Sequence, residues 1–247
     1  MCCSSFNCNL PKKRQMKHSK LQLYMTGFGP FKAITVNPSA AIGEAAAKEM
    51  VKDKELQVHY EELEVTYDAV SAYFKRLEED IAKHMEEDPE VCVLIVHVGL
   101  HSREQEGQMR LEVRAYNELE GSPIEELLPL DTYVESVFGC ERNAMSKTAA
   151  ELIEQLNAVI LKQGHEDGGR QRPHWLTSRD AGRYYCNYTL YKSVHLQKKW
   201  KDRVFPVFVH VANAYTCNNP SLEEQTAQVH SLVSGLVRIV RNKDTNS

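Results

Sequence analysis

The sequence predicts an α/β protein: a single-domain, three-layer α/β/α sandwich with a mostly parallel central sheet, over residues 20–243. Two observations predict this fold class. Strand-like and helix-like segments alternate along the chain, which is the order that builds a sheet with helices on both faces. The run VCVLIVHV at 91–98 is also continuously apolar apart from one histidine, and RVFPVFVHV at 203–211 is similar. Such runs are typical of strands that are buried on both faces of a parallel sheet.

The individual elements follow from apolar periodicity, alanine content and turn residues. The predicted strands are 21–25, 56–65, 91–98, 109–116 and 203–211. The predicted helices are 39–50, 67–87, 143–162, a helix that contains Cys186, and 221–241. Gly164 is expected to stop the third helix. Residues 121–137 are expected to be irregular, and the polar, glycine-rich residues 164–174 are expected to form an exposed insertion.

Composition restricts the classes of function. The formal net charge of −4 gives no indication of a nucleic-acid partner. No apolar run approaches the length of a membrane span, and the basic residues 12–14 are not followed by the apolar core of a secretory signal. The seven cysteines are odd in number and form no disulfide framework, which suggests a reducing compartment. We therefore expect a cytoplasmic protein with no membrane partner.

Residues 1–19 are polar or basic without periodicity, and we expect a flexible tail. Three of the cysteines lie there, and together with His18 they suggest a zinc site as one interpretation. Their spacing matches no closed Cys/His pattern, so we expect no metal. Palmitoylation of Cys2 and Cys3 is a second interpretation, but no myristoylation glycine follows Met1.

The candidate nucleophile is Cys186, within TSRDAGRYYCNYTLY at 177–191. Ser178 or Asp180 could cap a helix that has Cys186 in its first turns. Unpaired backbone N–H groups and the positive end of the helix dipole favour a thiolate there, and the thiolate is the strong nucleophile. The alternative is an inert cysteine that packs in the core.

The candidate base is His210, near the carboxyl end of the strand at 203–211. Catalytic groups of open α/β sheets gather at such strand ends, and the pKa of histidine suits it to activate a thiol. His97, inside the strand at 91–98, is expected to be a hydrogen-bonded core residue instead. A carboxylate could fix the tautomer of the base. Glu112 is one candidate, although its strand pattern fits a solvated surface glutamate as well.

The segment TGFGPF at 26–31 follows a strand and precedes a helix, which invites a dinucleotide-binding interpretation. That interpretation fails because the third glycine of the motif would fall at Lys32 and the loop continues beyond it. Pro30 and Phe31 also add bulk where a pyrophosphate needs bare backbone. Phe28 and Phe31 fit the wall of a small apolar pocket, or core anchors, better.

Four segments together resemble the pyroglutamyl-peptidase I (pyrrolidone-carboxylate peptidase) family of cysteine peptidases, which remove an N-terminal pyroglutamyl residue from peptides. The segments are TGFGPF with VNPS (26–31, 36–39), VHVGL (96–100), LEVRAYN (111–117), and DAGRYYCN with FVHV (180–187, 208–211). The similarity spans about residues 21–240. It implies a single α/β/α sandwich, peptides with an N-terminal pyroglutamate as partners, and no cofactor. The family contains monomers and tetramers, so either a monomer or a homo-oligomer is expected.

The resemblance also implies roles for individual residues. Cys186 would attack the scissile carbonyl, His210 would move the proton, and Glu112 would orient His210, while backbone N–H groups near Cys186 bind the oxyanion. The implied substrate-binding residues are Phe28 and Phe31 on the faces of the lactam ring, Asn37 near its carbonyl, Leu100 through its backbone, and Tyr184.

The chain departs from the family at several points. Residues 102–108 form a longer segment than expected, and an arginine that follows the glutamate motif in bacterial members has no counterpart in 118–123. The tail and the 164–174 insertion are additions. Two alternatives therefore stay open: a broader Cys–His amidase or peptidase, for which a lactam pocket would be superfluous, and a protein that binds pyroglutamyl peptides without cleaving them.

Overall fold

A computed structural model describes residues 21–102, 107–164, 174–216 and 220–243. The predicted tail at 1–19 lies outside these residues, as do residues 165–173 of the predicted insertion. Six of the described strands form one sheet with the order β2-β1-β3-β8-β4-β7. The strands are β1 (Leu21–Phe28), β2 (Leu56–Leu63), β3 (Val93–Leu100), β4 (Gln108–Glu112), β7 (His174–Ser178) and β8 (Val204–Val211).

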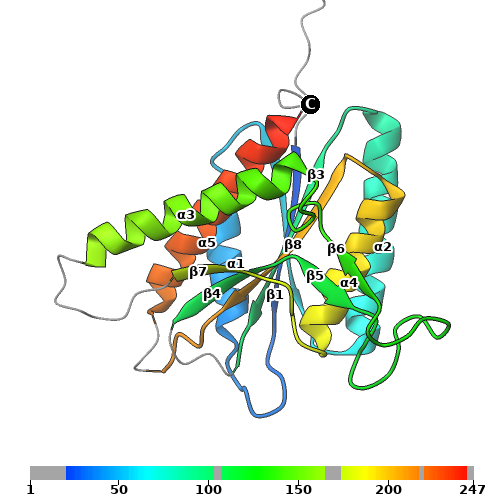
Figure 1. Ribbon diagram of the computed structural model, residues 1–247, viewed down its shortest axis with the longest axis horizontal. Helices are drawn as coiled ribbons and strands as arrows, with labels where there is room; N and C mark the ends of the chain where they lie inside the picture. The colour runs from blue at the N-terminus through cyan, green and yellow to red at the C-terminus, as the bar shows by residue number, and fades with distance from the viewer. Residues whose placement is uncertain (1–20, 103–106, 165–173, 217–219, 244–247) are drawn as a thin grey trace, which may run out of the picture.

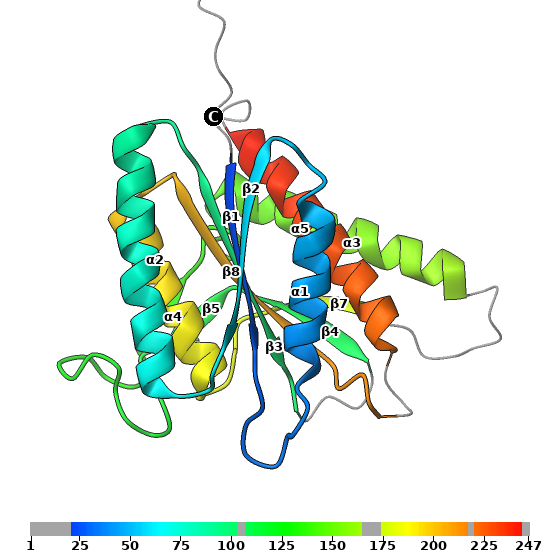
Figure 2. The ribbon, with the colours of Figure 1, turned by 180° about the vertical axis from the view of Figure 1, so that it is seen from behind.

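The prediction of a mostly parallel sheet between two helix layers is confirmed. Strands β2, β1, β3 and β8 are parallel, β4 is antiparallel to β8, and β7 is parallel to β4. Three helices cover one face and two cover the other (Figures 1 and 2). The first group is α1 (Pro38–Met50), α3 (Ala144–Gly164) and α5 (Leu222–Arg241); the second is α2 (Tyr67–Glu87) and α4 (Tyr185–Lys199).

The two most apolar strands form the centre of the sheet. Every residue of β3 and of β8 is buried, because the strands pair with each other in the middle of the sheet and are covered on both faces. Their register runs from Val93↔Val204 to Leu100↔Val211. The carboxyl ends of β1, β3 and β8 therefore meet at one edge, where the loop into α1 and the start of α4 also lie (Figure 1).

Two parts of the sheet differ from the prediction. The strand predicted at 109–116 is interrupted at Val113. The N–H of Val113 donates to Ser178 O, whereas its carbonyl accepts from the N–H of Ser136, so the residue bonds to two different segments. Beyond the interruption, β5 (Arg114–Tyr116) pairs with β6 (Tyr133–Glu135) in a separate two-stranded sheet. The edge strand β7 was missed, because its pattern of one buried tryptophan among partly exposed residues carries little strand signal.

His97 is confirmed as a hydrogen-bonded core residue. It is fully buried, with Nδ1 2.7 Å from Thr26 Oγ1 and Nε2 2.7 Å from Ser193 Oγ. Ser193 donates its own proton to Thr189 O, so its oxygen accepts from Nε2–H, and Nδ1 accepts from Thr26. Burial lowers the pKa of His97 to about 3. This neutral ring ties β1, β3 and α4 together.

In the described part of the chain, no helix is both long and apolar enough to span a membrane. The same residues contain no group of three or more His, Cys, Asp or Glu side chains placed to hold a metal ion.

Candidate active site

Cys186 is the second residue of α4, so its position in the first turn of a helix agrees with the expectation. The predicted cap was wrong. Tyr184 occupies the cap position with extended backbone and no capping side chain. Asp180 instead accepts a hydrogen bond from the N–H of Gly182, in a turn before the helix where Gly182 has a φ of +82°. The uncapped start leaves the first N–H groups of α4 without intrahelical acceptors, and they favour a negative charge at the cysteine sulfur.

His210 and Glu112 form a buried pair, with His210 Nδ1 2.9 Å from Glu112 Oε1. The sheet explains the contact. Glu112 lies opposite Phe208 in the antiparallel pairing of β4 and β8, and His210, two residues further on, shares that face. The alternative of a solvated surface glutamate is therefore wrong. Among the described residues, Oε2 of Glu112 has no hydrogen-bond partner. The hydrogen bond of this carboxylate within that part of the chain is the one to His210.

The environment of His210 favours its protonated form. Burial alone would lower its pKa, but the charge and hydrogen bond of Cys186, followed by those of Glu112, raise the pKa to about 10. These interactions favour a protonated imidazole beside the cysteine sulfur. A thiolate–imidazolium pair combines a strong nucleophile with an acid that can protonate a leaving group.

A glycine on the neighbouring strand leaves room for Phe208 and for the Cys186 thiol. Gly99 of β3 lies opposite His210 in the register. A Cβ added at Gly99 would lie 2.4 Å from the Phe208 ring and 3.3 Å from Cys186 Sγ. The absence of a side chain at Gly99 allows the Phe208 ring and the Cys186 thiol to sit directly over the strand end.

Cys186 faces a small, mostly apolar pocket. The structure brings all five predicted substrate-binding residues to it, although they come from separate segments. The pocket is lined by Phe28, Phe31, Asn37, Val65, Leu100, Tyr184, Tyr185 and Cys186. Sequence reasoning missed Val65 and Tyr185. Tyr185 could have been found as the immediate neighbour of the cysteine, whereas Val65 is placed there only by the topology.

Asn37 is held in a fixed orientation at this pocket. Its Oδ1 accepts a hydrogen bond from the N–H of Ser39, which caps α1, and its Nδ2 donates to Gly29 O at 3.0 Å. A primary amide carries two N–H donors. Among the described residues Nδ2 has one acceptor, so its second hydrogen can serve a ligand in the pocket that Asn37 lines.

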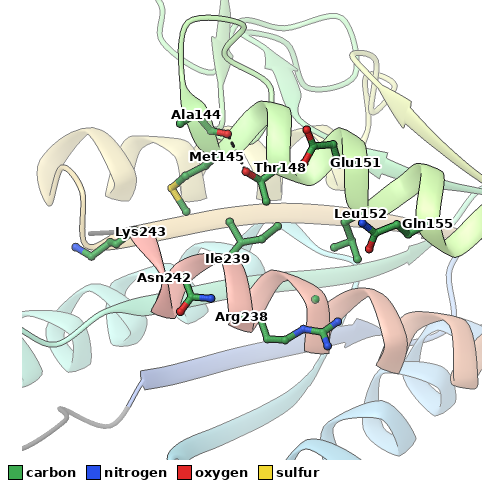
Figure 3. A pocket seen from close by; sticks show the side chains of 11 residues that line it. Ala144, Met145, Thr148, Glu151, Leu152, Gln155, Arg238, Ile239, Asn242 and Lys243 are labelled. Carbon is green, nitrogen blue, oxygen red and sulfur yellow. Dashed lines mark hydrogen bonds between the residues drawn. The ribbon is translucent and has the colours of Figure 1, made fainter. Parts of the chain in front are cut away.

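A wider pocket of about 290 Å³ lies elsewhere, between α3 and α5 (Figure 3). The side chains of Met145, Leu152 and Ile239 lie in it, with Glu151 and Arg238 near its edges. It contains none of the residues with candidate chemistry. A cavity of about 530 Å³ beside Asn37 is larger still, so size does not single out the pocket at Cys186.

The solved structures of pyroglutamyl peptidases share this fold. A pyroglutamyl peptidase I from Bacillus amyloliquefaciens is 20% identical, with a TM-score of 0.60 over 88% of this chain and 96% of that one. A mutant pyrrolidone carboxyl peptidase from Pyrococcus furiosus is 21% identical, with a TM-score of 0.59 over 89% and 100%. The corresponding enzyme of Fervidobacterium islandicum is 21% identical, with a TM-score of 0.58 over 89% and 99%. No family model and no curated protein matches the sequence.

Proposed function

We propose that this protein is a cysteine exopeptidase that hydrolyses the amide bond after an N-terminal pyroglutamyl residue of peptides. One observation carries the proposal: the thiol of Cys186, paired with His210, opens into a pocket that is walled by Phe28 and Phe31. A nucleophile with its acid–base partner provides the chemistry, and the pocket adjoining it provides the specificity. The fold of the solved pyroglutamyl peptidases supports the same conclusion.

The proposed reaction proceeds through a thioester. The Cys186 thiolate attacks the carbonyl carbon of the pyroglutamyl residue, and backbone N–H groups at the start of α4 stabilise the oxyanion. His210 donates its proton to the leaving amine as the C–N bond breaks. His210 then takes a proton from a water molecule as the water oxygen attacks the thioester carbon. The C–S bond breaks, pyroglutamic acid is released and the Cys186 thiolate is restored. Glu112 keeps the His210 ring oriented and stabilises its charge throughout.

The side chains that line the pocket suit a small, flat and neutral ring. Phe28 and Phe31 offer apolar faces to the lactam, the free Nδ2 hydrogen of Asn37 can bind its carbonyl, and the backbone carbonyl of Leu100 can accept its N–H. A glutamyl residue would bring a carboxylate among these apolar side chains, at a cost of several kcal/mol. A prolyl residue would lack the carbonyl and leave Asn37 without its acceptor.

The compartment is part of the proposal as well. Cys140 and Cys186 are free thiols, and thiols persist in this form in a reducing cytoplasm, which supports that location. The proposed partners there are peptides whose first residue is pyroglutamate.

The test is a comparison of three fluorogenic amides with the reduced protein: pyroglutamyl, prolyl and glutamyl coumarylamide. We expect cleavage of the pyroglutamyl amide, with kcat/KM for the other two lower by about 100-fold or more, since each leaves a buried group unpaired or buries a charge. Equal cleavage of all three would favour a broader amidase. Binding of a pyroglutamyl peptide without cleavage would favour a non-catalytic binder. If the protein neither cleaves the pyroglutamyl amide nor binds the peptide, the proposed pocket is refuted.

A further inference from the structure

Two tight turns face each other at the mouth of the pocket. In the first, Phe31 and Ile34 exchange both backbone hydrogen bonds, and Lys32 between them has a φ of +49°. In the second, Leu119 and Ser122 do the same, and Glu120 has a φ of +50°. Left-handed backbone is costly for residues other than glycine. Both turns thus hold a charged residue in an unfavourable conformation.

The two charged side chains meet over Tyr184. Lys32 Nζ lies 4.0 Å from the centroid of the Tyr184 ring and 3.8 Å from Glu120 Oε1. Tyr184 itself lines the pocket and packs near Phe31, with a centroid separation of 6.3 Å. Lys32 thus joins the turn that carries Phe31 to the opposite wall, by a cation–π contact and an ion pair.

The second turn is fixed to the helix that carries the thiol. The N–H of Glu120 donates to Arg183 O, and Asn187 Nδ2 donates to Glu118 O at 2.7 Å. Arg183 also pairs with the Glu118 carboxylate at 3.1 Å. The first turn, by contrast, belongs to the connection between β1 and α1. Movement of that connection would separate Lys32 from both of its partners.

The pocket is too narrow for a ring as it stands. Its free volume is about 20 Å³, whereas a single water molecule already needs about 10–15 Å³ by that measure. A five-membered lactam can enter only if the walls separate. Among the described residues, the turn that carries Phe31 makes no hydrogen bond to α4, so it can move relative to that helix without breaking one.

We infer that Lys32 and Glu120 form a clasp that closes the pocket over its ligand, and that opening of this clasp admits the ligand. The inference rests on the proposed function for the identity of the ligand, a pyroglutamyl ring. The closed clasp holds Phe31 and Tyr184 against the lactam and restricts the access of water and other solutes to Cys186. Lys32 and Glu120 are positioning residues and do not take part in the chemistry.

Alkylation of Cys186 by a bulky iodoacetamide derivative reports on opening without any need for peptidase activity. The reaction forms a C–S bond and releases iodide, and peptide mass spectrometry separates Cys186 from the other cysteines. Rates are compared on their pH plateau, so that a changed thiol pKa does not contribute. Lys32→Met removes the positive charge but keeps an unbranched side chain of similar length. It also keeps a residue other than glycine at the left-handed backbone position.

We expect Lys32→Met to accelerate alkylation of Cys186 about threefold to tenfold, which is the size of effect that an exposed ion pair and a cation–π contact allow. Lys48→Met is the matched control: Lys48 pairs with Glu44 on α1, with side-chain exposures of 69% and 51%, against 64% and 51% for Lys32 and Glu120. The control should leave the rate unchanged. Lys32→Glu combined with Glu120→Lys restores the ion pair, and should slow the reaction again relative to Lys32→Glu alone.

An unchanged alkylation rate in Lys32→Met would overturn the clasp, as would a charge-exchanged variant that reacts as fast as Lys32→Glu. Failure of the proposed function looks different. In that case the alkylation rates follow the expected pattern, but no pyroglutamyl amide is cleaved by the wild-type protein. If the clasp and the proposed function are both correct, Lys32→Met should also raise KM for the pyroglutamyl amide more than it changes kcat. The reason is that the ligand is held less firmly in the open pocket.

Discussion

Replacing Cys186 with alanine should reduce kcat for a pyroglutamyl amide by about 10⁴-fold or more and leave the protein folded. The thiolate forms the bond to the substrate, and no other described cysteine lines the pocket. The side chain is small and lies at a helix start, so its truncation removes little packing. The measurement is steady-state hydrolysis by the variant beside the wild-type protein, with circular dichroism to confirm the fold.

Cys140→Ala is the matched control, because Cys140 is a free thiol outside the pocket, and it should retain full activity. The Cys186→Ala variant should also lower the pKa of His210 from about 10, since the imidazolium loses the negative charge beside it. An NMR titration of the His210 ring measures this shift. Near-normal hydrolysis by Cys186→Ala would contradict the assignment of the nucleophile.

Replacing His210 with alanine should abolish turnover to a similar extent and also destabilise the fold. The activity is lost because no group remains to protonate the leaving amine. Stability is lost because Glu112 is fully buried and its hydrogen bond to His210 disappears. Removing one partner of a buried charge pair costs about 3–5 kcal/mol of the free energy of unfolding. Denaturant titration measures this cost.

A double variant separates the two effects. Glu112→Gln in the His210→Ala background removes the unpaired charge, so it should recover part of the lost stability but none of the activity. Glu112→Gln alone should retain more activity than either His210→Ala or Cys186→Ala, because the amide oxygen can still accept from Nδ1. Equal stability of His210→Ala and the wild-type protein would contradict the buried charge pair. Recovery of activity in the double variant would contradict the role of His210.

The sequence predicted the elements whose patterns are strong. The apolar runs of β3 and β8 and the amphipathic pattern of α2 required no tertiary information, and the parallel order followed from their alternation. The short strands β7 and β6, and the break between β4 and β5, were missed because short, half-exposed strands have no distinctive period. The cap of α4 was wrong because Tyr184 begins the helix without a capping side chain, a start that capping rules do not describe.

The candidate site was predicted by two different routes. Cys186 and His210 stood out from the residues themselves, at a helix start and a strand end. Glu112 did not, because a strand pattern cannot distinguish an inward-facing glutamate from a solvated one, and only the family resemblance selected it. The structure shows that it is buried against His210. Val65 and the Lys32–Glu120 contact could not have been predicted, because they depend on segments that are distant in the chain and meet only in the fold.

The most direct test of the account is affinity labelling with pyroglutamyl chloromethyl ketone, followed by peptide mapping. The lactam should occupy the pocket of Phe28 and Phe31 and place the chloromethyl carbon beside Cys186, whose sulfur displaces chloride. We predict one equivalent of label, on Cys186, with the prolyl analogue reacting far more slowly. Label on Cys92 or Cys140, or equal reaction with the prolyl analogue, would contradict the claim that a pyroglutamyl pocket and a reactive thiol form one site.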